Sequence, residues 1–387
     1  MEPIHKVSDH AAGIYIHIPF CQQKCRYCDF YSITDSNRIP DFLDGLKKEM
    51  NLSKSPDLKV DTLYIGGGTP SLLTAKQVGK IVDWTALCFN LEASAEMTLE
   101  VNPATATARD LQDYAAFGFN RINIGVQSFN DQQLAFLGRV HNGQQSLAAV
   151  EAAKAAGFNN IGLDLIYGLS EQSPAIWKND LKQAMRLIPK HLACYILSYE
   201  PHTPLYADRQ AGRIVPLSDI LTAELFRMTH DFLGVGGYDH YEISNFSRGP
   251  RWRSKHNQKY WNFVPYIGLG PAAHSFYFPK RWWNHRELDR YLQTLGQGSL
   301  PISEQEELSE EQLMIEALYL GLRQSDGLDL TFFRENFHVD FKLYFHTALD
   351  RFEAENWLDL DDKYCRLTVE GMLFLDRIVD ELVELID

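Results

Sequence analysis

Three cysteines lie within eight residues of one another, at Cys21, Cys25 and Cys28, in the spacing C-x3-C-x2-C. Thiolates are soft ligands that suit zinc or iron–sulfur clusters. A structural zinc site usually takes four ligands from two separated pairs, whereas the other three cysteines of this chain stand alone. Three local thiolates fit a cube of four irons in which one iron has no protein ligand. The plainer alternatives are three buried cysteines or an incomplete zinc site.

A glycine-rich turn follows a short apolar run directly and includes Gly67, Gly68 and Thr69. Glycines let the backbone approach a ligand closely, and we expect their N–H groups to be free to donate. The pattern is not the GxGxxG motif of dinucleotide-binding folds, so the sequence gives no support for NAD. Taken alone, such a pattern is often only a turn between two elements.

Polar side chains recur where later predicted strands end, at Glu100, Gln127 and Asp164, with Arg139 close behind. A carboxylate that faces into a barrel mouth is costly to bury unless it binds something, and ribose hydroxyls are suitable donors to it. An arginine can bind a ligand carboxylate through two parallel hydrogen bonds. Each residue alone is explained by a salt bridge or a helix cap. Their recurrence at successive strand ends favours a ligand site.

Strand-like and helix-like segments alternate through the first half of the chain and must position these residues. Six β then α units in succession predict a parallel sheet with right-handed crossovers. The expected fold class is α/β, a partial (β/α)6 barrel that is open on one side, with its chemistry on the loops after the strands. The predicted strands are 13–18, 62–65, 97–101, 121–126, 160–166 and 192–197. The predicted helices are 39–52, 74–89, 108–117, 144–156 and 174–188.

Charge divides the chain into three predicted parts. Residues 1–216 form the barrel, and residues 217–300 form an irregular aromatic segment with nine lysines and arginines against two acidic residues between Asn245 and Arg290. That excess predicts an anion nearby. Residues 301–387 hold 22 acidic against 7 basic residues and have the element order of a winged helix. Their charge excludes nucleic acid as a ligand, so we expect a packing or partner surface.

The overall composition, 45% hydrophobic and 23% charged, is that of a globular protein. It excludes a disordered chain, a fibrous repeat and a disulfide scaffold. No apolar run approaches the roughly 20 residues that span a bilayer, and the first ten residues lack a signal-peptide core. We therefore expect a soluble cytoplasmic protein whose cysteines are metal ligands or buried side chains.

The cysteine spacing, preceded by the segment YIHIPF, resembles the radical S-adenosylmethionine (SAM) superfamily. The resemblance implies a [4Fe-4S] cluster on Cys21, Cys25 and Cys28, whose free iron chelates the amino and carboxylate groups of SAM. An electron from the cluster, which a separate electron donor reduces, then splits the sulfonium to give a 5'-deoxyadenosyl radical. The glycine turn resembles the superfamily's glycine motif, which meets the SAM amino group.

Most of the chain is similar to the coproporphyrinogen dehydrogenase (HemN) subfamily, through the motifs around the strand ends and the C-terminal module. By that resemblance Glu100 and Asp164 contact the nucleoside, and Arg139 and Gln127 fix its polar end. Tyr15 and Tyr27 then also line the SAM site. The overall likeness leaves one alternative function open, the oxygen-independent oxidative decarboxylation of coproporphyrinogen III.

Two features favour a different branch of that subfamily. Phe30 stands where the dehydrogenases carry a fourth cysteine, and His256 opens the segment HNQKYW, which matches the HNxxYW motif of the HemW family. Similarity to that family implies a heme chaperone that delivers heme to respiratory proteins, with peripheral contact to membrane proteins. Whether SAM is cleaved stays open, and no residue is assigned a catalytic role.

A heme site needs aromatic surface, cations and an axial ligand such as histidine, and the basic aromatic segment contains all three. His256 is the candidate axial ligand or a plain hydrogen-bonded histidine, and His274 is a second ligand candidate or a wall of the SAM pocket. The candidates for the heme propionates are Arg251, Arg253, Lys255 and Lys259. The remaining alternative is an interaction protein stabilised by zinc.

Overall fold

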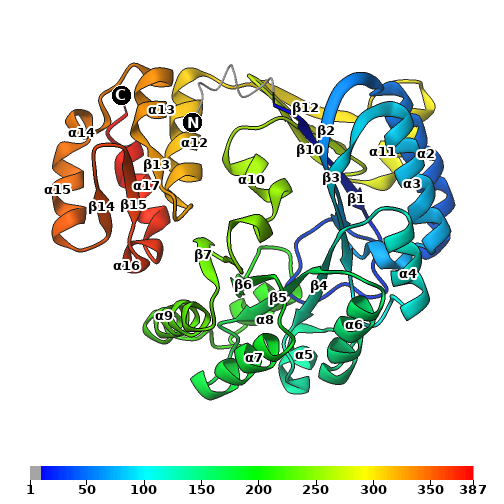
Figure 1. Ribbon diagram of the computed structural model, residues 1–387, viewed down its shortest axis with the longest axis horizontal. Coiled ribbons are helices and arrows are strands. Elements are labelled where there is room, and N and C mark those ends of the chain that lie inside the picture. Colours follow the sequence, from blue (N-terminus) through cyan, green and yellow to red (C-terminus); the bar gives the residue numbers. More distant parts are fainter. Residues whose placement is uncertain (1–9, 387) are drawn as a thin grey trace.

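Six parallel strands form the centre of the fold. The structure is a computed structural model that describes residues 10–386 (Figure 1). Strands β1 to β6 pair in sequence order and in parallel, as the alternating pattern predicts. Their bounds are β1 Ala12–Ile18, β2 Ser55–Gly67, β3 Phe89–Val101, β4 Arg121–Gln127, β5 Asn160–Tyr167 and β6 His191–Ile196. Inward and outward side chains alternate along each strand, so one face carries polar residues toward the barrel interior.

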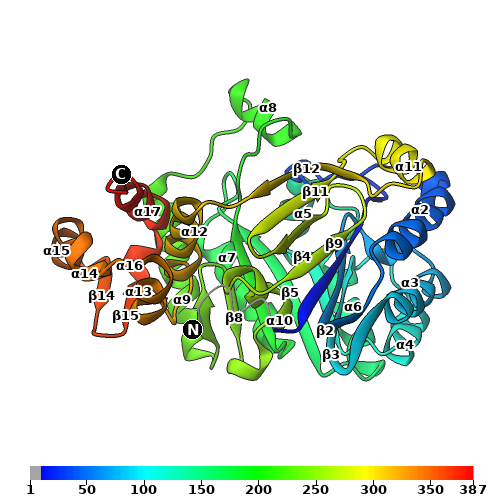
Figure 2. The same ribbon diagram turned by 90° about the horizontal axis from the view of Figure 1, so that it is seen from above.

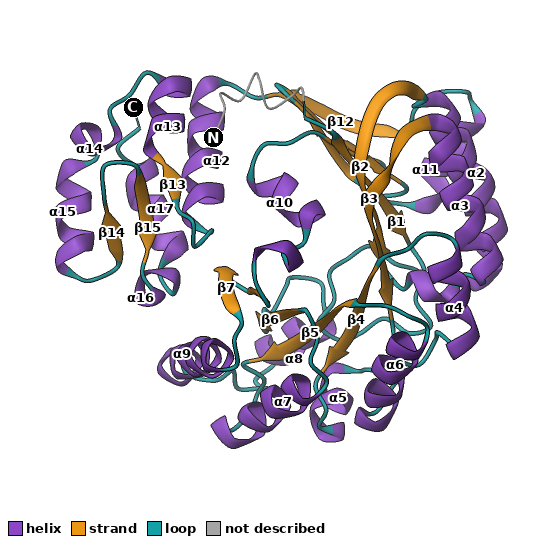
Figure 3. Cartoon of the chain, in the orientation of Figure 1, coloured by secondary structure: helices purple, strands orange, loops and turns teal. Residues whose placement is uncertain are grey.

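Helices cover the outer face of these strands (Figure 3). They are α2 Ile39–Leu52, α3 Ala75–Cys88, α4 Ala108–Ala116, α5 Asp131–Leu137, α6 Gly143–Ala155 and α7 Pro174–Arg186. Capping boxes begin α3, α4 and α6, where Thr74, Thr107 and Asn142 accept hydrogen bonds from the third residue of each helix. These caps explain why the helices begin within one residue of the positions that the sequence predicts.

The predicted irregular segment 217–300 instead extends the sheet at both edges. Strand β9 (Tyr266–Leu269) pairs in parallel with β1 and is followed by the antiparallel strands β10 (His274–Tyr277), β11 (Lys280–Asn284) and β12 (Ile302–Glu307). At the other edge lie β8 (Asn245–Ser247) and β7 (Asp239–Glu242). The same region holds helices α9 (Asp219–Val235), α10 (Lys255–Trp261) and α11 (Leu288–Gly296). The strands are too short to show a clear alternation in sequence.

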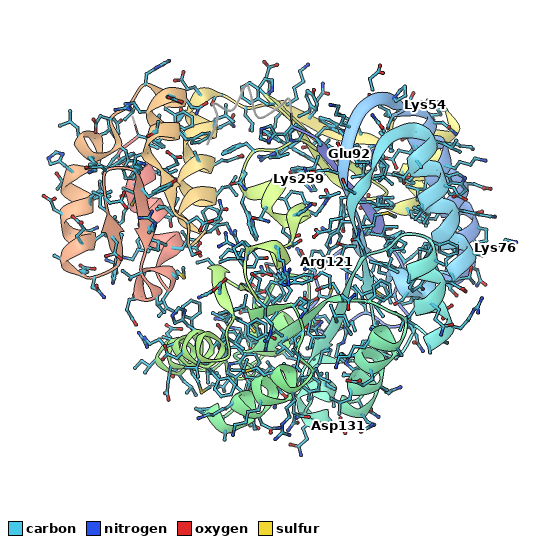
Figure 4. The ribbon with its side chains drawn as sticks, in the orientation of Figure 1. Lys54, Lys76, Glu92, Arg121, Asp131 and Lys259 are labelled. Atoms are coloured by element: carbon cyan, nitrogen blue, oxygen red, sulfur yellow. The ribbon has the colours of Figure 1, made fainter. Side chains whose placement is uncertain are left out.

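The sheet curves into a partial barrel, and α10 stands inside the curve (Figure 1). Figure 4 shows the side chains of Arg121 and Lys259 within the same concave region. Lys259 lies on α10 and forms an ion pair with Asp61 of β2, with 2.6 Å between Nζ and Oδ1. The segment that carries the HNxxYW motif therefore packs into the barrel rather than lying on the surface.

A C-terminal module packs against the barrel. It contains the sheet β13–β15–β14 and the helices α12 to α17. Its bounds are α12 Glu310–Leu322, β13 Leu328–Asp329, α13 Leu330–Phe337, α14 Phe341–Tyr344, α15 His346–Ala354, β14 Leu358–Leu360, β15 Tyr364–Leu367, α16 Val369–Met372 and α17 Leu375–Val383. Strand β12 precedes this module and belongs to the large sheet. None of the helices within residues 10–386 is long and apolar enough to cross a bilayer.

Acidic side chains of the C-terminal part neutralise some of the positive charge of the segment 245–290. Arg253 pairs with Asp326, at 2.6 Å between Nη1 and Oδ2, and Arg281 pairs with Glu316 of α12. The anion that the charge excess predicts is therefore, at these positions, the protein's own carboxylates. These ion pairs connect the basic segment 245–290 to the acidic C-terminal part of the chain.

Candidate functional site

A cavity of about 600 Å³ opens at the carboxyl ends of the central strands, where a barrel of this class carries its chemistry. It brings together most of the predicted site residues, from the cysteine loop and four different strand ends. The predicted residues that line it are Cys21, Cys25, Cys28, Tyr27, Gly67, Gly68, Thr69, Glu100, Gln127, Arg139 and Asp164. Tyr15, His256 and His274 do not line it.

The cysteine loop follows β1 and is fixed by backbone hydrogen bonds. Cys21 N donates to Ile33 O at 2.9 Å, and Cys28 N donates to Cys25 O at 3.3 Å. All six cysteines are free thiols, and these three are partly exposed. Burial raises the pKa of the Cys28 thiol to about 11, with the charges of Cys25 and Cys21 adding to the effect. The three sulfurs therefore lie close enough to influence one another's charge. Within residues 10–386, no three His, Cys, Asp or Glu side chains converge as ligands of a single metal ion.

Two polar side chains hold this loop against the cavity wall. Thr69 Oγ1 donates to the Cys21 sulfur at 3.5 Å, and Arg139 Nη1 donates to the Cys25 sulfur at 3.3 Å. The guanidinium can offset part of the negative charge that a metal-bound thiolate brings. The donor set therefore fits an iron–sulfur cluster with three thiolate ligands.

Helix α8 (Pro204–Gln210) stands away from the body of the sheet and reaches the cysteine loop (Figure 2). Leu205 N donates to Arg26 O at 3.0 Å, and the Arg26 guanidinium forms an ion pair with Asp208. Leu205 is buried in a small apolar cluster that also contains Leu137, Ile166, Leu169 and Leu197. The loop therefore has its own packing support on the side away from the main core.

The glycine turn allows two backbones to approach each other. Gly67 has a φ of +106°, and a Cβ on Gly68 would lie 2.6 Å from the carbonyl oxygen of Phe20. The expectation that these N–H groups are free is wrong. Gly67 N donates to Glu100 Oε2 at 3.2 Å, and Gly68 N donates to Ile18 O at 2.8 Å. The turn thus places the cysteine loop directly over the end of β2.

Two half-buried carboxyl groups, Glu100 and Asp164, face the cavity, and neither forms an ion pair with another of the described residues 10–386. Glu100 accepts hydrogen bonds from Tyr64 Oη at 2.8 Å and from Gly67 N, while Asp164 accepts one from Asn123 Nδ2 at 2.7 Å. Burial raises the pKa of Glu100 to about 7, with the Asp164 charge adding to it, and burial raises the pKa of Asp164 to about 6. Donors from a ligand, such as ribose hydroxyls, would stabilise both carboxylates.

Arg139 has an unused donor at the cavity. Its Nη2 donates to Gly125 O at 2.9 Å, whereas Nε is buried and has no hydrogen-bond partner in the part of the chain that the structure describes. Gln127 lies beside it with a φ of +67°, which an L-residue adopts only under constraint. A buried donor without a partner is a position where a polar ligand group fits.

The structure adds residues that the sequence prediction omits. Tyr64 and Asn123 hold the two carboxyl groups, and Phe30, Tyr195 and Ile196 form an exposed apolar part of the cavity lining. Asn123 was detectable, because it points to the same side of β4 as Gln127, four residues on. The role of Tyr64 depends on the pairing of β2 with β3, which the local sequence does not specify.

Tyr15 and His256 lie deeper in the barrel than predicted. Tyr15 Oη and His17 Nδ1 are 3.1 Å apart, and the Tyr15 ring lies 6.4 Å from that of His256. The His256 side chain is buried, its Nδ1 is 2.8 Å from Thr62 Oγ1 and its Nε2 is 2.9 Å from Tyr260 Oη. Burial lowers the pKa of His256 to about 3. Both ring nitrogens of this motif histidine are therefore engaged inside the protein.

Comparison with known proteins agrees with this geometry. Residues 15–184 match the model of the radical SAM superfamily, and residues 308–374 match the HemN C-terminal domain. The heme chaperone HemW of Escherichia coli is 40% identical over 68% of this chain and 69% of its own length. The heme chaperone HemW of Lactococcus lactis is 36% identical over 95% of this chain and 96% of its own length.

A solved structure shows the same fold. Coproporphyrinogen III oxidase (HemN) from Escherichia coli superposes with a TM-score of 0.83 at 24% identity, covering 98% of this chain and 92% of that one. The mitochondrial radical S-adenosyl methionine domain-containing protein 1 of Danio rerio is 30% identical over 98% of this chain and 88% of its own length. With the cysteine loop, the barrel and these relatives together, the chain belongs to the HemW family of the radical SAM superfamily.

Proposed function

We propose that this protein is a heme chaperone that carries a [4Fe-4S] cluster and SAM side by side and delivers heme to respiratory-chain proteins. The observation that carries the proposal is one cavity that holds three thiols, two half-buried carboxyl groups and an arginine whose buried Nε has no hydrogen-bond partner among residues 10–386. The names of the HemW relatives support heme as the cargo. Phe30 supports it too, because that position offers no fourth thiol.

Cys21, Cys25 and Cys28 would hold the cluster. When bound, the cluster would supply an electron and one iron that a small molecule can chelate. Binding requires the thiolate forms, so loading releases protons, and the raised pKa of Cys28 makes that release less favourable at low pH. Arg139 Nη1 offsets part of the negative charge that the thiolates bring. Loading is therefore expected to improve as the pH rises above neutral.

Glu100 and Asp164 would orient the nucleoside of SAM. When no ligand donates to them, pKa values of about 7 and 6 leave both groups partly protonated near neutral pH. Hydroxyl donors from a ribose favour the ionised form, so ligand binding would remove protons from these two groups. The buried Nε of Arg139 can donate to the polar end of the same ligand.

The proposal is tested with protein reconstituted under anaerobic conditions. About four irons and four sulfides per chain are expected, together with stoichiometric heme binding and transfer of that heme to an apo acceptor from the respiratory chain. Cys28→Ala serves as the matched control without a complete cluster site. Failure of the cluster-loaded protein to bind heme would reject the chaperone function, and formation of protoporphyrinogen from coproporphyrinogen III would favour the dehydrogenase alternative.

A further inference from the structure

The end of strand β4 has a backbone conformation that its surroundings must enforce. Gln127 has a φ of +67°, in the left-handed region that residues other than glycine rarely adopt. Its side chain lines the cavity, and a Cβ built on Gly125 would lie 3.0 Å from Gln127 Nε2 and 3.4 Å from Arg139 Nη2. The two polar groups therefore lie side by side over Gly125. Strain of this kind persists only where surrounding contacts hold it.

Asp180 of helix α7 makes such contacts with the residues that follow Gln127. Its Oδ2 accepts a hydrogen bond from Ser128 Oγ at 2.6 Å, and its Oδ1 accepts one from Phe129 N at 2.9 Å. Asp180 is 0% exposed, and no cation pairs with it among residues 10–386. Burial raises the pKa of Asp180 to about 6, and the two hydrogen bonds act against this rise. A buried carboxylate without a cation is costly, so packing alone does not explain an acid at this position.

The residue that precedes Gln127 is held as well. His141 is buried, and its Nε2 lies 3.0 Å from the carbonyl oxygen of Val126. Asp180 lies 52 residues beyond Ser128 in the sequence. Side chains from two other parts of the chain therefore fix both flanks of Gln127, and tertiary contacts set its conformation.

The same loop begins the helix that leads to Arg139. Ser128 Oγ accepts a hydrogen bond from Asn130 N at 3.0 Å, and the Asn130 side chain accepts from two backbone N–H groups in the first turn of α5. Beyond the end of this helix, Arg139 N donates to Leu134 O at 2.9 Å. By holding Ser128, Asp180 therefore fixes the start of the segment whose end carries Arg139.

We propose that Asp180 is a positioning residue for the SAM site. Through Ser128 and Phe129 it holds Gln127 in the conformation that presents its amide, beside Arg139, to the polar end of SAM. This assignment rests on the proposed function, because that function places SAM in this cavity. Asp180 does not line the cavity, and it is assigned no contact with SAM.

The test measures SAM binding by the cluster-loaded full chain, through calorimetry and through the change that SAM causes in the g values of the reduced cluster. In Asp180→Ala the Kd for SAM is expected to rise about tenfold, because Gln127 and Arg139 lose their fixed positions. The iron content should stay that of the wild type, since the three cysteines remain. Asp180→Asn can still accept from Phe129 N, so it should restore most of the affinity.

A double-mutant cycle separates positioning from general destabilisation. Gln127→Ala should also weaken SAM binding, and its combination with Asp180→Ala should bind SAM no more weakly than Asp180→Ala alone. Thr229→Val is the matched control, because Thr229 Oγ1 accepts a buried hydrogen bond from Trp177 Nε1 of the same helix α7, at 2.8 Å. This variant disturbs α7 without removing a contact to the loop, so its SAM affinity should be that of the wild type.

Wild-type SAM affinity in Asp180→Ala, fully additive losses in the cycle, or an equal loss in Thr229→Val would overturn the assignment and leave the SAM site standing. If Asp180→Ala does not fold, Ser128→Ala removes one of the two contacts and should raise the Kd about threefold. Unchanged affinity in that variant would also overturn the assignment. Absence of SAM binding by the cluster-loaded wild type would reject the SAM site of the proposed function together with this assignment.

Discussion

The ionisation of Glu100 lowers the folding stability of the cofactor-free protein, and this loss can be measured. Burial raises the pKa of this carboxyl group from 4.5 to about 7, so it binds a proton more tightly in the folded than in the unfolded chain. One pKa unit is about 1.36 kcal/mol. Folding stability is therefore lost as the pH rises from 4.5 to 7, and the full loss above pH 7 is about 3 kcal/mol.

Glu100→Gln removes this charge but keeps an acceptor for Tyr64. The amide cannot accept from Gly67 N at the same time, and the lost hydrogen bond costs about 1 kcal/mol. The free energy of unfolding of the cofactor-free variant should therefore equal that of the wild type near pH 5 and exceed it by about 2 kcal/mol at pH 8. The same variant should bind SAM more weakly, because the amide is a poorer acceptor for ribose hydroxyls.

Urea denaturation at pH 5 and pH 8, with SAM affinity from calorimetry, measures both effects. Glu151→Gln is the matched control, since Glu151 is exposed and its ion pair with Lys154 is expected to contribute less than about 1 kcal/mol. A Glu100→Gln protein that is less stable than the wild type at pH 8, or that binds SAM with unchanged affinity, would refute the reasoning.

Four further variants have defined outcomes. Cys28→Ala should lose most bound iron in metal analysis, while its circular dichroism spectrum stays that of the wild type. In the wild type, Arg323 Nη2 lies 3.0 Å from Oε2 of the buried Glu242. Arg323→Met leaves this carboxylate buried without its cation, so the free energy of unfolding measured in urea should fall by about 3 kcal/mol. Arg227→Met breaks an exposed ion pair and should change stability by less than about 1 kcal/mol; equal losses in the two variants would contradict this. His256→Ala should lower stability by about 2 to 3 kcal/mol in the same assay, because two buried hydroxyls lose a partner.

The regular part of the fold follows from sequence patterns. The six parallel strands and five helices occur where the alternation predicts them, because their apolar periodicity agrees with the caps at Thr74, Thr107 and Asn142. The short strands β7 to β11 were not predicted. A strand of three to five residues, such as β8 (Asn245–Ser247), carries too few alternations to be recognised, and it forms because the edge of a longer strand pairs with it.

The sequence predicts the part of the site that lies at the ends of long strands, because those strands have a recognisable pattern. Residues at the ends of long strands, such as Glu100 and Asp164, line the cavity as expected. His256 sits on a helix of seven residues whose position inside the barrel depends on tertiary packing, so no local pattern reveals that it is buried. The basic residues of the segment 245–290 form ion pairs with Asp326 and Glu316, which are distant in sequence. No local pattern predicts such pairs.

The most direct test of the account is anaerobic electron paramagnetic resonance of the reduced protein, recorded with and without SAM. A cluster held by Cys21, Cys25 and Cys28 with one open iron should give the signal of a reduced [4Fe-4S] centre, and SAM should change its g values. Zinc in place of iron and sulfide after reconstitution, or a cluster signal that SAM leaves unchanged, would contradict the central claim that this cavity holds both cofactors together.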